Sequence, residues 1–98
     1  MSVTRCLYHT KYREIGRKIA IYRNIRGFSQ EELADKIGIS KSYLSKIEAS
    51  NSDIAFSLDV LFSIADGLEL EVAVFFQPIN EENLLKNNLN WSEGNGKH

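Results

Sequence analysis

The stretch "KSYLSK" carries five polar side chains that share the outward side of a predicted short helix: Lys41, Ser42, Tyr43, Ser45 and Lys46. Ammonium and hydroxyl groups donate hydrogen bonds, and the two lysines add positive charge. None of the five has an evident partner in a core, because Leu44 and Ile47 supply the inward side of the same helix. A helix about 10 Å wide with such a face fits the major groove of B-form DNA.

Two helices and a turn are needed to present this face, and the surrounding sequence predicts them. "SQEE" indicates a capping box, in which Ser29 caps a helix and Glu32 returns the bond. Gly38 ends that helix where a left-handed conformation is easiest, and Ser40 caps the next helix. Two helices joined by so short a turn cross steeply, and we assign Ala34 to the crossing as its small residue. The apolar anchors of the pair are Leu33, Ile37, Leu44 and Ile47.

A longer helix is predicted before this pair. Its apolar residues follow the i, i+3, i+7, i+10 pattern of one helix face: Tyr12, Ile15, Ile19 and Tyr22. Thr10 is the expected N-cap and Gly27 the expected stop.

Two further helices are predicted after the polar loop "ASNSDIAF". Ser57 caps the fourth helix, and its expected inward side consists of Leu58, Leu61, Phe62, Ala65 and Leu68. "EVAVFF" predicts a short fifth helix, or alternatively a strand, that ends at Pro78. Because Pro78 is the only proline and glycines are few, an all-α domain is favoured over a sheet sandwich.

A chain of 98 residues suffices for one small domain with one core. The pattern divides it into an N-terminal extension (1–11), a helical domain (12–77) and a polar C-terminal tail (78–98). In the tail, Asn80 can cap a short amphipathic turn that holds Leu84 and Leu85, and the last several residues are expected to be disordered.

The net charge of -1 conceals a strong asymmetry along the chain. Residues 1–26 hold seven Lys/Arg and one acidic residue, a net charge of +6, whereas residues 51–98 hold two basic and eight acidic residues, a net charge of -6. Because a polyanion responds to the local field of one face, the first third can face phosphates while the last third faces away. The alternative interpretation is that the two halves attract each other.

Several classes of protein are not expected. The sequence shows no nucleophile–base pair, no paired catalytic carboxylates and no glycine-rich phosphate loop, so it predicts no enzyme and no cofactor. Cys6 and His9 have C-x-x-H spacing but cannot complete a metal site alone. A single cysteine fits a reducing compartment, and the longest apolar run, 72–76, is too short to span a bilayer. Without a signal-like start, a cytoplasmic location is expected.

The segment "IGRKIAIYRNIRGFSQEELADKIGISKSYLSKIEAS" resembles the helix-turn-helix domain of Cro/CI-type (XRE-like) transcriptional regulators. "SQEELA", "IGIS" and "YLSKIE" occur in order and with the spacing of that family, and the resemblance covers roughly residues 12–76. It implies a five-helix, lambda-repressor-like fold and a sequence-specific regulator that reads double-stranded DNA. It also implies a homodimeric repressor.

The resemblance also assigns roles to individual residues. It makes 30–37 the positioning helix and 41–49 the recognition helix, whose first, second and sixth residues face base edges. Lysine donates to guanine O6 and N7, so a half-site containing G is expected. Arg23 and Glu48 match a structural pair of the family. The predicted DNA-contacting residues are Gln30, Ser40, Lys41, Ser42, Tyr43, Ser45, Lys46, Asn51 and Arg17, with Gln30 on a phosphate and Tyr43 on the backbone.

The loop after the recognition helix departs from the family pattern. It is about two residues longer than usual and holds no Lys or Arg, and Asp53 would repel a phosphate. Each lost phosphate contact weakens binding and lowers its salt dependence by about one unit of slope. We therefore expect moderate affinity per monomer, with Arg13, Arg17, Lys18 and Asn51 as candidate backbone contacts.

The segment "LELEVAVFFQPI" supplies more apolar side chains than one short helix buries in so small a core: Val72, Val74, Phe75 and Phe76. An exposed remainder would mark a homodimer interface. Alternatively, the tail folds back and covers this surface with Leu84, Leu85 and Trp91. Both interpretations follow from the same surplus.

Two other functions are compatible with these residues. One is an antitoxin that binds operator DNA and neutralises a toxin through its acidic 81–98 segment. The other is a helical interaction module that has lost DNA binding, as the non-basic loop suggests. Charge reversal at Lys41 and Lys46 separates a DNA-binding regulator from this module, and co-purification of a small basic partner would favour the antitoxin.

Overall fold

Four α-helices and one 3-10 helix make up residues 8–79, which are the residues that the computed structural model describes. They are α1 (His9–Ile25), α2 (Gln30–Ile37), α3 (Lys41–Glu48), α4 (Leu58–Leu68) and η2 (Val72–Phe76). The expected all-α class is confirmed. The fifth element is a helix rather than a strand, although it is of the 3-10 type. The tail residues Leu84, Leu85 and Trp91 lie outside this part of the chain.

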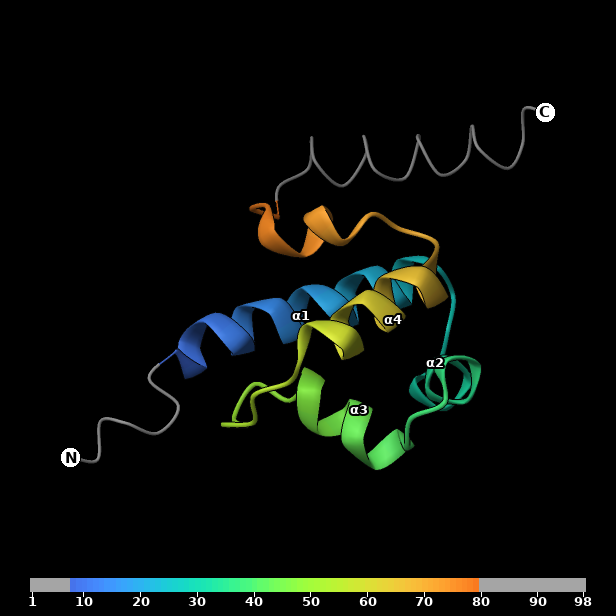
Figure 1. Ribbon diagram of the computed structural model, residues 1–98, viewed down its shortest axis with the longest axis horizontal. Helices are drawn as coiled ribbons and strands as arrows, with labels where there is room; N and C mark the ends of the chain where they lie inside the picture. The colour runs from blue at the N-terminus through green and yellow to red at the C-terminus, as the bar shows by residue number, and fades with distance from the viewer. Residues whose placement is uncertain (1–7, 80–98) are drawn as a thin grey trace.

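α1 and α4 lie side by side in the middle of the domain, with α2 and α3 on one side of them and η2 on the other (Figure 1). On one side α3 packs against both α1 and α2, and α2 also packs against α4. On the other side η2 packs against α1 and α4. The arrangement leaves one side of α3 without a neighbouring helix.

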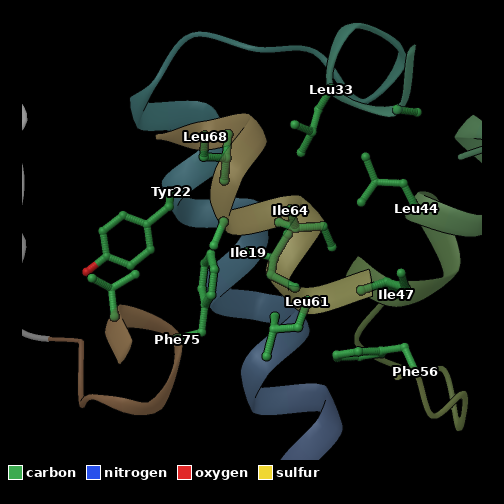
Figure 2. Close-up of a cluster of buried hydrophobic side chains, with 13 residues drawn as sticks. Ile19, Tyr22, Leu33, Leu44, Ile47, Phe56, Leu61, Ile64, Leu68 and Phe75 are labelled. Atoms are coloured by element: carbon green, nitrogen blue, oxygen red, sulfur yellow. The ribbon is translucent and has the colours of Figure 1, made fainter. Parts of the chain in front are cut away.

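The core draws large apolar side chains from every element, as Figure 2 shows. The fully buried ones are Ile19, Leu33, Leu44, Ile47, Ile64, Leu68 and Phe75. The predicted anchors Leu33, Leu44 and Ile47 are among them, Ile37 is half-buried against them, and Ala34 is buried at the crossing. The prediction of the apolar sides of α2 and α3 is therefore confirmed.

Local capping chemistry determines where the helices begin. Ser29 Oγ accepts a hydrogen bond from the Glu32 N–H at 3.0 Å, and the Glu32 carboxylate accepts one from the Ser29 N–H at 2.8 Å, which confirms the capping box. Ser40 and Ser57 cap α3 and α4 through Oγ, which accepts a hydrogen bond from the N–H of Tyr43 and of Val60 respectively. Gly38 adopts φ 79°, so the turn between α2 and α3 has the left-handed residue that it requires.

The start of α1 differs from the prediction. The helix begins at His9 with Tyr8 as its N-cap, so Thr10 lies in the first turn and does not cap it. The carbonyl oxygen of Tyr8 accepts hydrogen bonds from the N–H groups of Lys11 and Tyr12, at 2.9 and 3.1 Å. These backbone bonds close the first turn without any capping side chain.

Two residues of α4 were wrongly placed in the core. Leu58 and Phe62 are 60% and 47% exposed, whereas Ile64 is fully buried. At about 100° per residue Phe62 lies roughly 110° from the middle of the buried stripe formed by Leu61, Ile64, Ala65 and Leu68. Leu58, the first residue of the helix, lies beside that stripe and is nevertheless exposed.

Two of the four residues that the sequence indicated for a homodimer interface are not exposed. Val74 is 4% exposed, and Phe75 is fully buried and meets Tyr22 edge to face with ring centroids 6.0 Å apart. Both belong to the monomer core. Val72 is half-buried, and Phe76 is 57% exposed.

Gly16 allows α1 to approach the backbone of α3. A methyl group at this position would overlap the carbonyl oxygen of Ile47. The two helices therefore meet with backbone against backbone at this point. This contact sets the depth at which α3 lies on the core.

A buried ion pair sets the orientation of α3 relative to α1. Arg23 Nε donates to Glu48 Oε2 at 2.8 Å, and Nη2 donates to Oε1 at 2.9 Å. The two side chains are only 10% and 5% exposed. Arg23 Nη1 also donates to the carbonyl oxygen of Phe28 at 2.7 Å. The pair expected from the family resemblance is thus present, and it is structural.

We predict that Gly16→Ala destabilises the domain by about 2 kcal/mol, because an overpacked contact costs more than the helix propensity of alanine returns. Urea unfolding measures the difference. Glu14→Ala, an exposed change on the same helix, is the control and should stay within about 0.5 kcal/mol of the wild type. A Gly16→Ala protein as stable as the wild type would contradict the close approach.

For the ion pair, we predict that Arg23→Leu and Glu48→Leu each cost about 3–5 kcal/mol, because each leaves a buried charge without its partner. The double substitution should cost much less than the sum of the two. Thermal and urea unfolding of the four proteins in the cycle provides the measurement. Strictly additive losses would show that the two side chains do not act as a pair.

Candidate nucleic-acid interface

The outward side of α3 gathers four of the nine predicted DNA-contacting residues. Lys41, Ser42 and Lys46 are exposed, and Ser45 is half-buried. Within residues 8–79, none of these four side chains makes a hydrogen bond or an ion pair. Their positions span about 140° of the helix, opposite the buried Leu44 and Ile47. The helix thus presents two ammonium groups and two hydroxyls that are available to an external partner.

Ser40 and Tyr43 are tied more closely to the fold than the other residues of this stretch. Ser40 Oγ accepts a hydrogen bond from the Tyr43 N–H at 3.0 Å, which occupies the hydroxyl oxygen but leaves its proton for donation. Tyr43 is half-buried and packs against the core. It therefore borders the outward side of α3, which differs from the fully outward position that the sequence predicted.

Gln30, at the start of α2, faces the buried ion pair. Its Nε2 atom donates to Glu48 Oε1 at 2.9 Å. A carboxylate only accepts hydrogen bonds, so this contact fixes which end of the amide points toward Glu48. The amide nitrogen keeps a second N–H for an external acceptor. The predicted phosphate contact of Gln30 is compatible with this geometry and stays a prediction.

The loop between α3 and α4 is held against α1 by Arg13. Its Nε donates to the carbonyl oxygen of Ser52 at 2.9 Å, and its Nη2 donates to Asp53 Oδ1 at 2.7 Å. Arg13, a candidate phosphate contact in the sequence, is thus engaged within the domain, and Asp53 has a cation beside it. Asn51 is exposed in this loop.

Only part of the basic first third is available to a polyanion. Besides Arg13 and Arg23, Arg26 is engaged internally, because its Nε donates to the carbonyl oxygen of Leu68 at 3.1 Å. Burial lowers the pKa of Arg26 from its ordinary value, and the nearby Glu69 carboxylate acts in the opposite direction. Arg17 is exposed. Attraction between the basic and acidic parts of the chain therefore holds for Arg13 with Asp53, and the phosphate contact of Arg17 stays a prediction.

Three positioning features were not predicted from the sequence. They are the close approach at Gly16, the contact of Gln30 with Glu48, and the contacts of Arg13 with the loop. The last joins residues 40 positions apart, for which the sequence carries no periodic signal. A glycine inside an otherwise continuous helical pattern is the one cue that could have indicated Gly16.

Residues 8–79 hold no group of three or more His, Cys, Asp or Glu side chains that could bind a metal ion. None of its helices is long and apolar enough to cross a membrane.

The chain is similar in sequence to two curated transcriptional regulators. The chain is 42% identical over 65 residues to the HTH-type transcriptional regulator SlrR of Bacillus subtilis (strain 168), covering 63% of this chain and 40% of SlrR. It is 56% identical over 34 residues to the HTH-type transcriptional regulator SinR of the same organism, covering 35% of this chain and 31% of SinR. The chain thus spans less than half the length of each regulator.

A solved structure has the same fold. A mutant of the restriction-modification controller protein C.Esp1396I superposes with a TM-score of 0.61 and 29% sequence identity, covering 81% of this chain and 96% of that protein. Its match extends over most of the described helices and supports the lambda-repressor-like architecture. The named relatives are regulators and a controller rather than enzymes, in agreement with the expectation for this chain.

The family model described as helix-turn-helix matches residues 19–75. This range includes both helices of the predicted pair, the turn at Gly38 and the Arg23–Glu48 ion pair. The chain therefore belongs to the helix-turn-helix family of the Cro/CI type.

Proposed function

We propose that this chain is a cytoplasmic transcriptional regulator that binds double-stranded DNA by placing α3 in the major groove. One observation carries the proposal. Among residues 8–79, Lys41, Ser42, Ser45 and Lys46 of α3 have no side-chain partner, while Leu44, Ile47 and Glu48 hold the helix from behind. A rigidly held helix with an unpaired cationic face matches the shape and charge of the groove. The names of the two curated relatives support the same function.

The contacts divide into base readout and backbone positioning. Lys41 and Lys46 can donate to guanine O6 and N7, which favours a half-site that contains G. Gln30, Ser40, Arg17 and Asn51 are proposed to contact phosphates at the edges of the groove. The loop that holds Asn51 carries no Lys or Arg, so each domain should bind with moderate affinity and a shallow salt dependence.

Moderate affinity per domain supports a homodimer that reads two half-sites about 34 Å apart. We propose repression as the sign of regulation, because a dimer seated on a promoter excludes polymerase by its volume alone. Both statements go beyond the family assignment and rest on the proposed DNA binding.

The dimer surface must differ from the one that the sequence indicated, because Val74 and Phe75 are buried in the monomer. Tyr8, Leu58 and Phe76 are 58%, 60% and 57% exposed, and all three line a groove of about 400 Å³. No residue of α2 or α3 lines this groove, so a second copy bound there leaves the DNA-contacting helices free. We propose this groove as the site of self-association.

For DNA binding, we predict that Lys41→Gln with Lys46→Gln weakens binding by at least about 30-fold, the effect of losing two base contacts of about 1 kcal/mol each. The salt slope should fall by about one to two units. Fluorescence anisotropy with a labelled duplex selected from a random pool by the wild-type protein is the measurement. Unfolding curves should stay unchanged, because both side chains are exposed and unpaired.

The matched control is Ala73→Glu with Gln77→Glu, which changes the net charge equally at exposed positions in and next to η2. This region lies at the opposite end of the domain from α3 (Figure 1). The control should retain most of the wild-type affinity. If both double variants bind equally well, or lose affinity equally, α3 is not the DNA-binding face.

For self-association, we predict that Leu58→Ser with Phe76→Ser converts a dimer into a monomer in sedimentation experiments. The affinity for a duplex with two half-sites should fall at least tenfold, because the second domain is no longer tethered near its half-site. The affinity for a duplex with one half-site should stay the same, because the contacts of each domain with DNA are unchanged. Phe62→Ser is the control, since Phe62 is exposed on α4 but does not line the groove. A dimer that survives the double substitution would exclude this surface.

A further inference from the structure

The loop between α3 and α4 has an ordered tip although it contains little regular structure. The Ser52 N–H donates to the carbonyl oxygen of Ala49 at 3.2 Å, which closes a turn with Ser50 and Asn51 at its tip. The Ile54 N–H donates to Ser52 Oγ at 3.1 Å. Both tip residues are exposed.

Two neighbouring residues of α1 hold this loop in place. Arg13 binds its tip half through Ser52 and Asp53, as described above. Tyr12 holds its end half, because its ring meets the buried Phe56 edge to face with centroids 5.0 Å apart. The loop between α3 and α4 is therefore attached to α1 in both of its halves.

The ion pair of Arg13 with Asp53 also changes the electrostatics of the loop. Asp53 is the only charged residue between Ala49 and Ser57, and its side chain is 72% exposed. Without a cation beside it, this carboxylate would oppose a nearby phosphate. The Arg13 guanidinium, 2.7 Å away, offsets that charge while it holds the loop.

We propose that Arg13 and Asp53 form a latch that positions the Ser50–Asn51 turn for contact with the DNA backbone beside α3. This inference rests on the proposed function and adds two positioning residues to it. Neither residue needs to touch the phosphate. Arg13 acts through the N–H groups on Nε and Nη2 that it already donates to the loop, two of its five.

The proposed latch and simple charge repulsion predict opposite effects of removing Asp53 on DNA affinity. Removing an acidic residue from a DNA-facing loop ordinarily strengthens DNA binding. If Asp53 acts through Arg13 to hold the turn, Asp53→Ala weakens binding instead. Its effect should then be no larger than that of Arg13→Ala, which also removes the bond to Ser52, and the two effects should not add, because both changes release the same turn.

The test is a double-mutant cycle of Arg13→Ala, Asp53→Ala and the combined variant, measured by fluorescence anisotropy on the duplex selected by the wild-type protein. We expect each single variant to bind about fivefold more weakly, the effect of about one hydrogen bond, and the combined variant to bind no more weakly than either. The salt slope should stay within about half a unit of the wild-type value. Arg13→Lys, which keeps the charge but not the fork, should bind with intermediate affinity.

Glu71→Ala is the matched control, because it removes an exposed acidic side chain at the η2 end of the domain, away from α3 (Figure 1). It should not weaken binding. Three results would overturn the latch: tighter or unchanged binding by Asp53→Ala, additive losses in the cycle, or a slope that falls by about one unit in Arg13→Ala alone. The last result would make Arg13 a direct phosphate contact.

A second measurement needs no DNA. Amide hydrogen exchange of Ser52 and Ile54 in the free protein should become faster by a similar factor in Arg13→Ala and Asp53→Ala, because both amides are bonded within the latched loop. Exchange that stays at the wild-type rate would overturn the latch. If the free loop behaves as expected and the wild-type protein selects no duplex, the proposed function fails instead, and the two failures are thereby distinguished.

Discussion

A single buried carboxylate joins the three helices that form the interface. Glu48, at the end of α3, accepts two hydrogen bonds from Arg23 of α1 and one from Gln30 of α2. Arg23 reaches onward to the carbonyl oxygen of Phe28, just before α2. A buried charge is tolerated only when its partners are in place, so this network permits one arrangement of the three helices and disfavours others.

Packing and the ion pair act on α3 in complementary ways. The close approach at Gly16 sets the depth of the helix, and Leu44 and Ile47 anchor its apolar side in the core. Glu48 then fixes its rotation about its own axis. Because the other sides of α3 pack against the core or bond to α1 and α2, Lys41 and Lys46 both project outward. The charged face of α3 is thus a consequence of what holds the helix as well as of its own sequence.

Local signals in the sequence predicted the helix-turn-helix unit well, because its determinants act over a few residues. The capping box at Ser29, the left-handed Gly38 and the cap at Ser40 all belong to interactions between near neighbours. Two local predictions failed: Thr10 does not cap α1, because the Tyr8 carbonyl closes the first turn through backbone bonds, and Phe62 of α4 lies away from the core. Tertiary contacts such as the close approach of Gly16 to Ile47 carry no such local signal.

The candidate site shows the same division. The outward residues of α3 follow from helical periodicity, whereas the engagement of Arg13 by a loop 40 residues away does not. Counting basic residues in the first third overestimated the charge available to a polyanion, since Arg13, Arg23 and Arg26 are used inside the domain. Which charges remain free is a property of the fold rather than of the composition.

The most direct measurement of the central claim is a dimethyl sulfate footprint on a duplex selected by the wild-type protein. Dimethyl sulfate methylates guanine N7 in the major groove and adenine N3 in the minor groove. If α3 lies in the major groove with Lys41 and Lys46 at base edges, bound protein should protect guanine N7 in each half-site and leave adenine N3 reactive. Unprotected guanine N7 on a fully occupied duplex, or protection confined to adenine N3, would contradict the account.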